Sequence, residues 1–308
     1  MKKLFIFSII SLTALFISCD DKIDIDLPDS DAVIVVDAWL NNLPENQKII
    51  LTWSQNYFDS NEPTGITDAQ VTVTDGADTF DFVHTDNGTY IWTPPDGEVF
   101  GTIGSEYTLA VNINGEEFTS VTQMNQVPTV DSVTFKFEPE DTFFPDSYLG
   151  EFWSRDIEGE GNTYWIKSYK NGELLSKPSE MNIAYDAGFN KGGGLDNLIF
   201  IPPIRNAVNP FDEDANDEFV SPYKDGDALK VEIHSISEDA FNFLTNVRVQ
   251  TDRPGGFGEL FAQPLSNVPT NIVSSNPNAT KVAQGFFNVA AIESNSATLD
   301  VSKVPKGN

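Results

Sequence analysis

The sequence has 308 residues but only one cysteine and two histidines, and both scarcities limit the chemistry available to it. A disulfide within the chain needs two cysteines, so we expect the fold to be held together by packing alone. With Cys19 as the only thiol, a zinc site would need His84, His234 and additional carboxylates. Neither a Gly-x-Ser-x-Gly motif nor a His-Glu-x-x-His motif occurs. The sequence therefore predicts no catalytic residues and favours a protein that is not an enzyme.

Positive charge is also scarce. Eighteen Lys and Arg residues stand against 47 Asp and Glu residues, which gives a formal net charge of −29. Nucleic acids and anionic lipids are bound by clusters of basic side chains, and no such cluster is present. The composition thus excludes nucleic acid as a partner. If Lys2 and Lys3 are removed with a signal peptide, 16 bases against 47 acids leave about −31.

Long hydrophobic runs are absent except at the start of the chain. Lys2 and Lys3 precede an apolar run of about fourteen residues, 4–17, which is shorter than the roughly twenty residues of a membrane-spanning helix. The run ends at Ser18-Cys19, a pattern typical of a bacterial lipoprotein signal. We expect residues 1–18 to be a signal peptide and Cys19 to carry lipid, palmitate or a similar acyl chain. The alternative is an ordinary signal peptide cleaved elsewhere.

Acidic residues dominate the segment that follows this cysteine. We interpret residues 19–31 as an acidic tether between the lipid and the first strand. Its opening pair, Asp20-Asp21, resembles the surface-export signal of Bacteroidota lipoproteins. This resemblance implies an outer-membrane protein that faces the cell surface. In an enterobacterium, the Asp after Cys would instead indicate retention at the inner membrane.

Convincing helical patterns are few, whereas 18 Pro, 21 Gly and 23 Phe indicate short strands joined by many turns. The continuous run 33–36 predicts a strand buried on both faces, and 107–113 shows the longest alternation of apolar and polar residues. Asn114-Gly115 predicts a two-residue hairpin turn. Residues 32–125 therefore predict a β-sandwich of immunoglobulin-like or transthyretin-like type.

A boundary is expected at Gln126-Val127-Pro128, after which 126–308 reads as a larger β-rich domain with one short helix. Asn171-Gly172 predicts a second hairpin. The motif Ser235-Ile236-Ser237-Glu238 resembles a capping box, so we expect a helix of about three turns with Phe241, Leu244 and Val247 on one face. The predicted fold class is mainly β.

The two histidines fall on strands with different expected environments. His84 continues the face of Phe80 and Phe82, which predicts a histidine at the edge of the core with a satisfied hydrogen bond. His234 alternates with apolar residues alongside Lys230 and Glu232, which predicts a polar face in contact with water. A Ser-His-Asp arrangement stays open at this level, because sequence gives no distances.

The acidic segment 212–218 is the one candidate metal site. Asp212, Asp214 and Asn216 are candidate calcium ligands, because hard cations are bound by several oxygens from one loop. The EF-hand pattern fails, since its sixth position is Asp217 where Gly is required. The alternative interpretation is a solvated acidic loop. No other cofactor is expected.

Two further features could take part in sugar chemistry. Asp131-Ser132-Val133 resembles the short Bacteroidota O-glycosylation motif, so Ser132 is a candidate modification site. Trp153, Tyr164 and Trp165 could stack on sugar rings, but aromatic residues in a Phe-rich β-protein belong to the core more often.

Several segments together resemble a known family: 23–28, 35–40, 54–59 and 69–75. The family comprises uncharacterised Bacteroidota outer-membrane lipoproteins, known only as a domain of unknown function and often encoded beside TonB-dependent receptors. In addition, 69–73 and 88–90 are similar to carboxypeptidase-regulatory and transthyretin-like domains.

The resemblance implies a surface-anchored outer-membrane lipoprotein that is a non-enzymatic accessory subunit of a TonB-dependent transporter. The implied partners are that receptor and, through the N-terminal lipid, the membrane. A stand-alone glycan-binding or adhesion module is the alternative, and a surface hydrolase is less favoured.

Overall fold

The computed structural model describes residues 31–306 except 57–58, 143, 214, 216–218 and 279–281. Cys19, the expected signal peptide and residues 19–30 of the expected tether lie outside the described residues. Ala32–Gln55 and Asp59–Asn308 form one compact unit, which contains every element named below. Within the described part of the chain, no helix is both long enough and apolar enough to cross a membrane.

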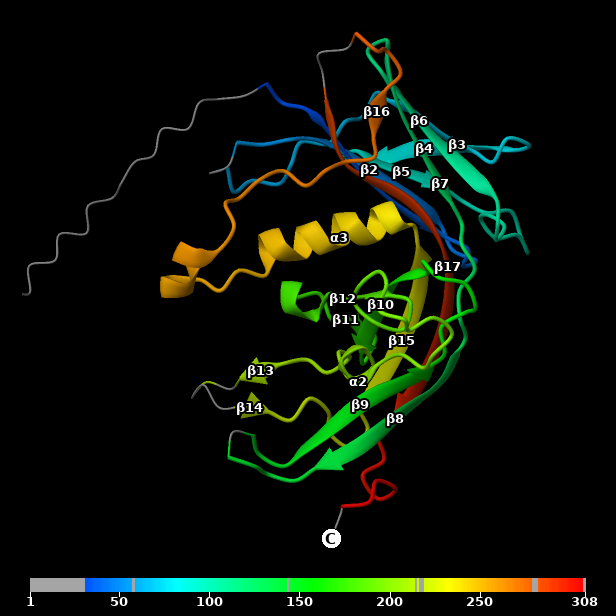
Figure 1. Ribbon diagram of the computed structural model, residues 1–308. Coiled ribbons are helices and arrows are strands. Elements are labelled where there is room, and N and C mark those ends of the chain that lie inside the picture. The colour runs from blue at the N-terminus through cyan, green and yellow to red at the C-terminus, as the bar shows by residue number, and fades with distance from the viewer. Residues whose placement is uncertain are drawn as a thin grey trace, which may run out of the picture. The chain divides into compact units, whose positions relative to one another are not determined.

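The chain is mainly β, as the sequence predicted, and most strands belong to one large mixed sheet (Figure 1). Its strands follow the order β11-β10-β15-β17-β1-β2-β5-β4-β3-β6-β7-β16, and β12 pairs with β10. The strands of this sheet are β1 (Ile34–Asn41), β2 (Gln47–Trp53), β3 (Gln70–Thr74), β4 (Thr79–Asp86), β5 (Thr89–Trp92), β6 (Glu106–Ile113), β7 (Glu116–Gln123), β10 (Thr163–Lys170), β11 (Glu173–Leu174), β12 (Asn182–Tyr185), β15 (Ala228–Ile236), β16 (Val273–Ser274) and β17 (Ala283–Thr298).

Two small antiparallel pairs lie outside the main sheet. β8 (Val130–Glu138) pairs with β9 (Ser147–Ser154), and β13 (Asp212–Glu213) pairs with β14 (Phe219–Val220). The helices are short: α2 (Pro202–Arg205), α3 (Glu238–Thr251) and the 3-10 turns η2 (Pro178–Glu180) and η3 (Gly256–Phe261). The single helix expected from sequence is thus joined by α2 and two 3-10 turns.

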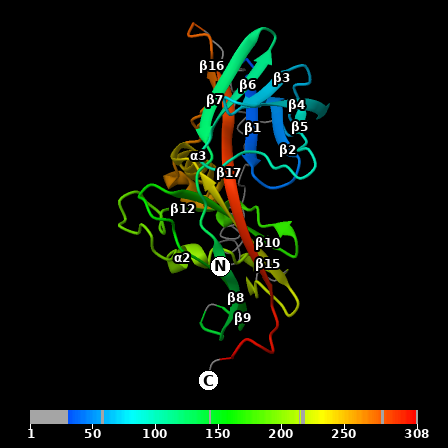
Figure 2. The ribbon, with the colours of Figure 1, turned by 90° about the vertical axis from the view of Figure 1, so that its right-hand side faces the viewer.

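Strand β17 lies near the end of the described chain and pairs with β1, which lies near its start. It runs parallel to β1 and antiparallel to β15, so strands far apart in sequence lie side by side (Figure 2). The segment 286–292 is buried throughout, because β17 is flanked on both edges and packed on both faces. The main sheet therefore contains strands from both the expected 32–125 and the expected 126–308 domains.

The first strand differs from its prediction. Ile34, Val36 and Ala38 are buried on one face of β1, whereas Val35 is half-buried and Asp37 is exposed on the other. The prediction of burial on both faces was wrong, because a short run of valines and isoleucines looks alike in one-sided and two-sided strands. The two hairpin predictions are confirmed: β6 joins β7 at Asn114-Gly115 and β10 joins β11 at Asn171-Gly172, all with positive φ.

Three apolar clusters hold the unit together. The first fills the space within β1–β7 and β17, where β7 packs across from β17. The second joins β8, β9 and α2 to β10 and β15, with Phe152 and Tyr223 fully buried. The third lies between α3 and the sheet, where Leu244 and Ala240 meet Phe286. Figure 1 shows α3 lying beside this sheet.

The cap of α3 lies two residues later than the sequence motif suggested. Ser237 is the N-cap, and its hydroxyl accepts a hydrogen bond from the Ala240 N–H at 3.1 Å. Ser235 still belongs to β15. The prediction of a capping box begun by Ser235 was therefore wrong, because the strand continues through the first half of the motif. The position three residues after Ser237 is Ala240, which has no side chain to reach back.

Candidate functional site

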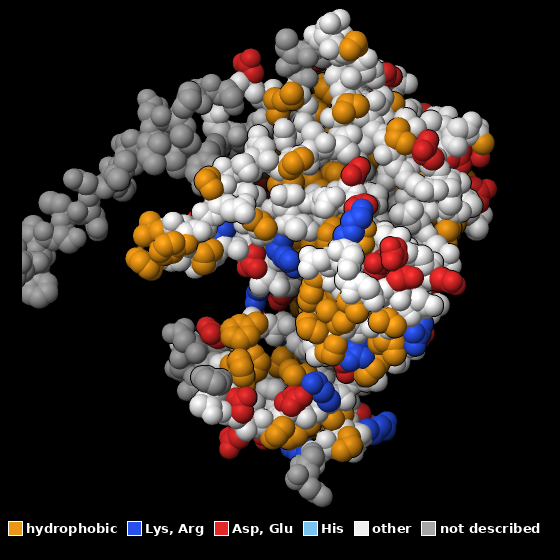
Figure 3. All heavy atoms as spheres, viewed as in Figure 1, with side chains coloured by type: hydrophobic (Ala, Val, Ile, Leu, Met, Phe, Trp, Pro, Cys, Tyr) orange, Lys and Arg blue, Asp and Glu red, His pale blue; other side chains and the backbone are white. Residues whose placement is uncertain are grey.

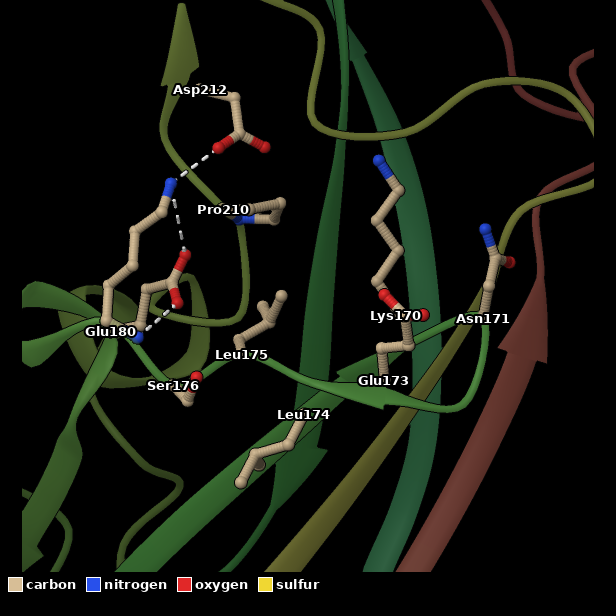
Figure 4. Close-up of a pocket in the computed structure, with 10 residues that line it drawn as sticks. Lys170, Asn171, Glu173, Leu174, Leu175, Ser176, Glu180, Pro210 and Asp212 are labelled. Atoms are coloured by element: carbon tan, nitrogen blue, oxygen red, sulfur yellow. Dashed lines mark hydrogen bonds and ion pairs between the residues drawn. The ribbon is translucent and has the colours of Figure 1, made fainter. Parts of the chain in front are cut away.

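A polar pocket of about 540 Å³ lies beside the turn between β10 and β11 (Figure 4). It is lined by Lys170, Asn171, Glu173, Leu174, Leu175, Ser176, Lys177, Glu180, Pro210 and Asp212. We call it the polar pocket. It brings the end of β10 next to η2 and the first residue of β13, segments that are about forty residues apart in sequence.

The two lysines of the polar pocket, Lys170 and Lys177, are already engaged by neighbouring protein groups. Lys177 Nζ lies 2.5 Å from Asp212 Oδ1 and 4.0 Å from Glu180 Oε1, and the hydrogen bond to Asp212 raises the pKa of Lys177. Lys170 Nζ donates to the Pro222 carbonyl at 2.6 Å and lies 3.6 Å from Asp227 Oδ2. An ammonium therefore already occupies the position where a ligand's cation would meet Asp212.

Of the three candidate calcium ligands, the structure describes Asp212. Asp212 contacts Lys177, whereas Asp214 and Asn216 lie outside the described residues. Among the residues that the structure does describe, no group of three acidic, His or Cys side chains is placed to hold a metal ion. Calcium binding at 212–218 therefore stays a prediction.

A second pocket, of about 350 Å³, shares Pro210 with the first and is mainly apolar. We call it the aromatic pocket. Its walls include Phe144, Phe211 and Phe219, whose rings lie 5.0 Å (Phe144 to Phe219), 5.3 Å (Phe211 to Phe219) and 6.5 Å (Phe144 to Phe211) apart. Phe144 is 45% exposed and Phe211 is 54% exposed. Figure 3 shows apolar side chains gathered around the β13–β14 hairpin. Exposed aromatic rings in a concave surface are typical of a binding site.

The aromatic pocket is held in place by hydrogen bonds to β9. Asn209 Oδ1 accepts from the Gly150 N–H at 2.6 Å, and its Nδ2 donates to the Gly150 carbonyl at 2.9 Å. On the other side of the hairpin, the Tyr148 N–H donates to Ser221 Oγ at 3.0 Å. Gly150 leaves room for the Leu229 side chain, since a Cβ there would lie 2.5 Å from Leu229 Cδ2. The chain is thus tied to β9 immediately before and after the hairpin.

The rim of the aromatic pocket is polar. Glu138, Asp141 and Ser147 line it together with Pro139 and Pro145. An apolar floor with carboxylates at its edge can hold an apolar side chain while its polar neighbours are hydrogen-bonded at the rim. The arrangement is suited to binding an apolar group with polar neighbours.

A separate cluster of ionisable side chains lies on β10 and β15. Glu232 is buried and accepts hydrogen bonds from Tyr169 Oη at 2.9 Å and Lys230 Nζ at 2.7 Å. His234 Nε2 lies 3.0 Å from the same carboxylate. Burial alone would raise the pKa of Glu232, but hydrogen bonds from His234 and Lys230 outweigh it and lower the pKa to about 2.

His234 is therefore buried, and the prediction that it faces water was wrong. Burial lowers its pKa to about 4, although the hydrogen bond with Glu232 raises it in part. The ring is thus neutral at pH 7. Trp165 lies on the neighbouring strand with its ring 6.2 Å away, and Lys167 Nζ lies 3.9 Å from the centre of the Trp165 ring.

The two histidines are not brought together. In the sheet order, β17, β1, β2 and β5 separate β15 from β4, which carries His84. A zinc site that uses both is therefore not formed by the described strands. The expected hydrogen bond of His84 is also absent: its buried Nε2 has no hydrogen-bond partner among the described residues, and the ring contacts Tyr90 at 5.3 Å.

The three aromatic residues proposed from sequence are used within the fold. Tyr164 is fully buried and donates to Asp156 Oδ1 at 2.5 Å. Trp153 packs under the Arg205 guanidinium, whose Cζ lies 3.9 Å from the ring centre. Ser132 is half-buried at a bulge in β8, opposite Trp153, and its glycosylation stays a prediction. The sequence reasoning missed Phe144, Phe211 and Phe219, which lie in or beside short loops and belong to no periodic pattern.

One comparison with known proteins identifies a relationship. A family model described as "Domain of unknown function (DUF4249)" matches residues 20–296, which is most of the chain. No curated protein matches the sequence. The matched range begins directly after Cys19 and includes both pockets and the cluster of ionisable side chains on β10 and β15.

Proposed function

We propose that this chain, which belongs to the DUF4249 family of domains of unknown function, is a lipid-anchored outer-membrane protein that binds a partner without catalysis. In this proposal Cys19 carries the lipid, and the partner is a TonB-dependent transporter for which the chain acts as an accessory subunit. The signal pattern at 2–19 supports the anchor. The aromatic pocket supports binding.

The binding proposal rests on one difference between the aromatic pocket and the two groups of ionisable side chains. The ionisable groups around Asp212 and Glu232 are engaged with neighbouring protein groups. By contrast, Phe144 and Phe211 present about half of their surface to solvent in a concave, largely apolar site. Exposed aromatic side chains that are fixed by a rigid support are typical anchors of protein–protein interfaces.

A lipid anchor makes a moderate intrinsic affinity sufficient. Two proteins held on one membrane meet at an effective concentration far above that of free proteins, so a pocket of this size can maintain an association. The anchor and the pocket would then act together: the first confines the chain to the membrane and the second selects the partner.

A glycan-binding or adhesion module is the second candidate, and the composition of the aromatic pocket favours it over a hydrolase. Flat aromatic faces stack on the apolar faces of sugar rings, and carboxylates such as Glu138 can accept hydrogen bonds from hydroxyl groups. The two candidates differ in what the protein retains when it is purified.

Affinity purification of the tagged full-length protein from gently solubilised native outer membranes distinguishes them. The proposal predicts a TonB-dependent receptor in near-stoichiometric amount by mass spectrometry. Recovery of the lipidated, surface-exposed protein alone would contradict the accessory-subunit proposal. Binding to a glycan array by that same preparation would then support the second candidate.

A further inference from the structure

A small group of apolar side chains lies exposed beyond the end of α3. Phe257, Leu260 and Phe261 belong to η3 and are 77%, 74% and 78% exposed. We call these three residues the apolar knob. Figure 1 shows η3 projecting past the end of α3, and Figure 3 shows apolar side chains gathered at that projection. Side chains this large and this exposed, from one short segment, indicate contact with something outside the described chain.

The base of the knob is fixed by specific contacts. Gly255 and Gly256 have positive φ values of 62° and 50°, which turn the chain into η3. Arg253 Nε donates to Glu259 Oε1 at 2.5 Å, and Arg253 Nη1 donates to the Gln263 carbonyl at 2.8 Å. The knob is thus presented by an organised turn rather than by an unsupported loop.

The charged residues beside the apolar knob are paired with each other. Arg253 and Glu259, the charged residues at its base, neutralise each other as an ion pair. The exposed tip therefore consists of two phenyl rings and an isobutyl group, with the two rings 5.6 Å apart. An uncharged tip can leave water without the large cost of desolvating a lone charge.

The size of the knob favours a bilayer over a protein groove. A Phe side chain buries roughly 150–250 Å², so three such groups bury at most roughly 450–750 Å², less than the roughly 800 Å² that each partner of a stable protein interface buries. A convex tip of this size is sufficient to enter the boundary between headgroups and acyl chains. Electrostatic attraction to anionic lipids is excluded by the net charge of −29, so the contact must be apolar.

We propose that Phe257, Leu260 and Phe261 insert into the interfacial layer of a phospholipid bilayer and orient the protein on the membrane. This inference rests on the proposed lipid anchor at Cys19. A lipid attached at one point does not fix orientation, and a tether of thirteen residues, 19–31, can span at most about 45 Å. A second contact point would hold the aromatic pocket at a defined angle to its partner.

The test uses the full-length lipidated protein in dioleoylphosphatidylcholine vesicles. Leu260→Cys is labelled with an environment-sensitive fluorophore, and Val83→Cys serves as the control because Val83 is 65% exposed and lies on β4. The Cys19 thiol is occupied by lipid in this preparation. We expect a blue-shifted emission at position 260 and at least twofold stronger quenching by doxyl-labelled lipid than at position 83.

Three outcomes are informative. Equal emission and quenching at positions 260 and 83, in protein that floats with the vesicles, would overturn the knob proposal and leave the anchor intact. A blue shift at 260 only in native membranes, and not in pure lipid, would also overturn it and indicate a protein partner. Protein that does not float with the vesicles would contradict the anchor at Cys19 and this inference together. In the double variant Phe257→Ser/Phe261→Ser, the lipid quenching of the label at 260 should fall at least twofold.

Discussion

His234 and Glu232 lie two residues apart on β15, with His234 Nε2 3.0 Å from Glu232 Oε2, and both are buried. The alternation of the strand places them on the same face. That face is polar in sequence but is shielded by Tyr169, Lys230 and Trp165 on the same and the neighbouring strand. The pair therefore forms part of the folded structure, and its protonation is linked to stability.

The buried His234 should make the protein less stable in mild acid. Its pKa is lowered to about 4 in the folded state, against an ordinary value of 6.5, so the unfolded chain binds the proton more readily. The free energy of unfolding should fall as pH decreases from 7.5 to 5, by about 1 to 2 kcal/mol from this residue. Urea unfolding at both values should show a smaller fall in His234→Gln. An equal fall in wild type and variant would contradict the assignment.

Asp156 should have the opposite effect. Burial raises its pKa to about 6, although hydrogen bonds from Tyr164 and the Asn197 N–H lower it in part. The folded state then binds the proton more readily than the unfolded state, whose Asp titrates near 3.8. This contribution to the free energy of unfolding rises as pH falls from about 7 to about 4. Asp156→Asn should lack it, so the pH profile of the variant should fall more steeply in acid than that of wild type. A superimposable profile would show that Asp156 is not perturbed.

Removal of the α3 cap should weaken the packing of the helix on the sheet. Ser237 Oγ accepts the Ala240 N–H, and loss of such a cap costs about 1 kcal/mol. We expect that loss in the free energy of unfolding of Ser237→Ala by urea titration. Ser237→Asn keeps a side-chain acceptor and should stay within a few tenths of a kcal/mol of wild type. Equal destabilisation by both substitutions would mean that the hydroxyl does not act as a cap.

Among the glycines of the main sheet, Gly285 should be the most sensitive to substitution by alanine. It pairs with Val36 between β17 and β1, has a φ of 91°, and a Cβ there would lie 1.9 Å from the Val36 carbonyl oxygen. Gly285→Ala should cost about 3 kcal/mol or more, since a backbone clash adds to the strain of positive φ. Gly97→Ala is the matched control, because Gly97 has a φ of 81° and open space, so it should cost about 1 kcal/mol. Similar losses in thermal or urea unfolding would contradict the close approach of β1 and β17.

The sequence predicted local features well because they depend on neighbouring residues. Asn114-Gly115 and Asn171-Gly172 form the expected hairpins, and the mainly β class is confirmed. The pairing of β1 with β17 was not predicted, because periodicity within a strand does not reveal a partner about 250 residues away. The buried state of His234 was missed for the same reason.

The candidate site was less predictable than the fold. Phe144 lies between β8 and β9, whereas Phe211 and Phe219 lie at the β13–β14 hairpin, which Asn209 and Ser221 tie to β9. No spacing rule brings such residues together. The apolar knob, in contrast, lies in one contiguous segment, 257–261, whose glycine-rich start reads in sequence only as a flexible loop.

Site-specific photo-crosslinking in intact cells tests the central claim most directly, because it reports the partner and the surface at once. A photoreactive amino acid is introduced in place of Phe211 in the aromatic pocket, and in place of Phe189, which is also exposed but does not line that pocket. The account predicts a crosslink from position 211 to a TonB-dependent receptor, identified by mass spectrometry, and none from position 189. Absence of any receptor crosslink at 211, in protein shown to be lipidated and surface-exposed, would contradict it.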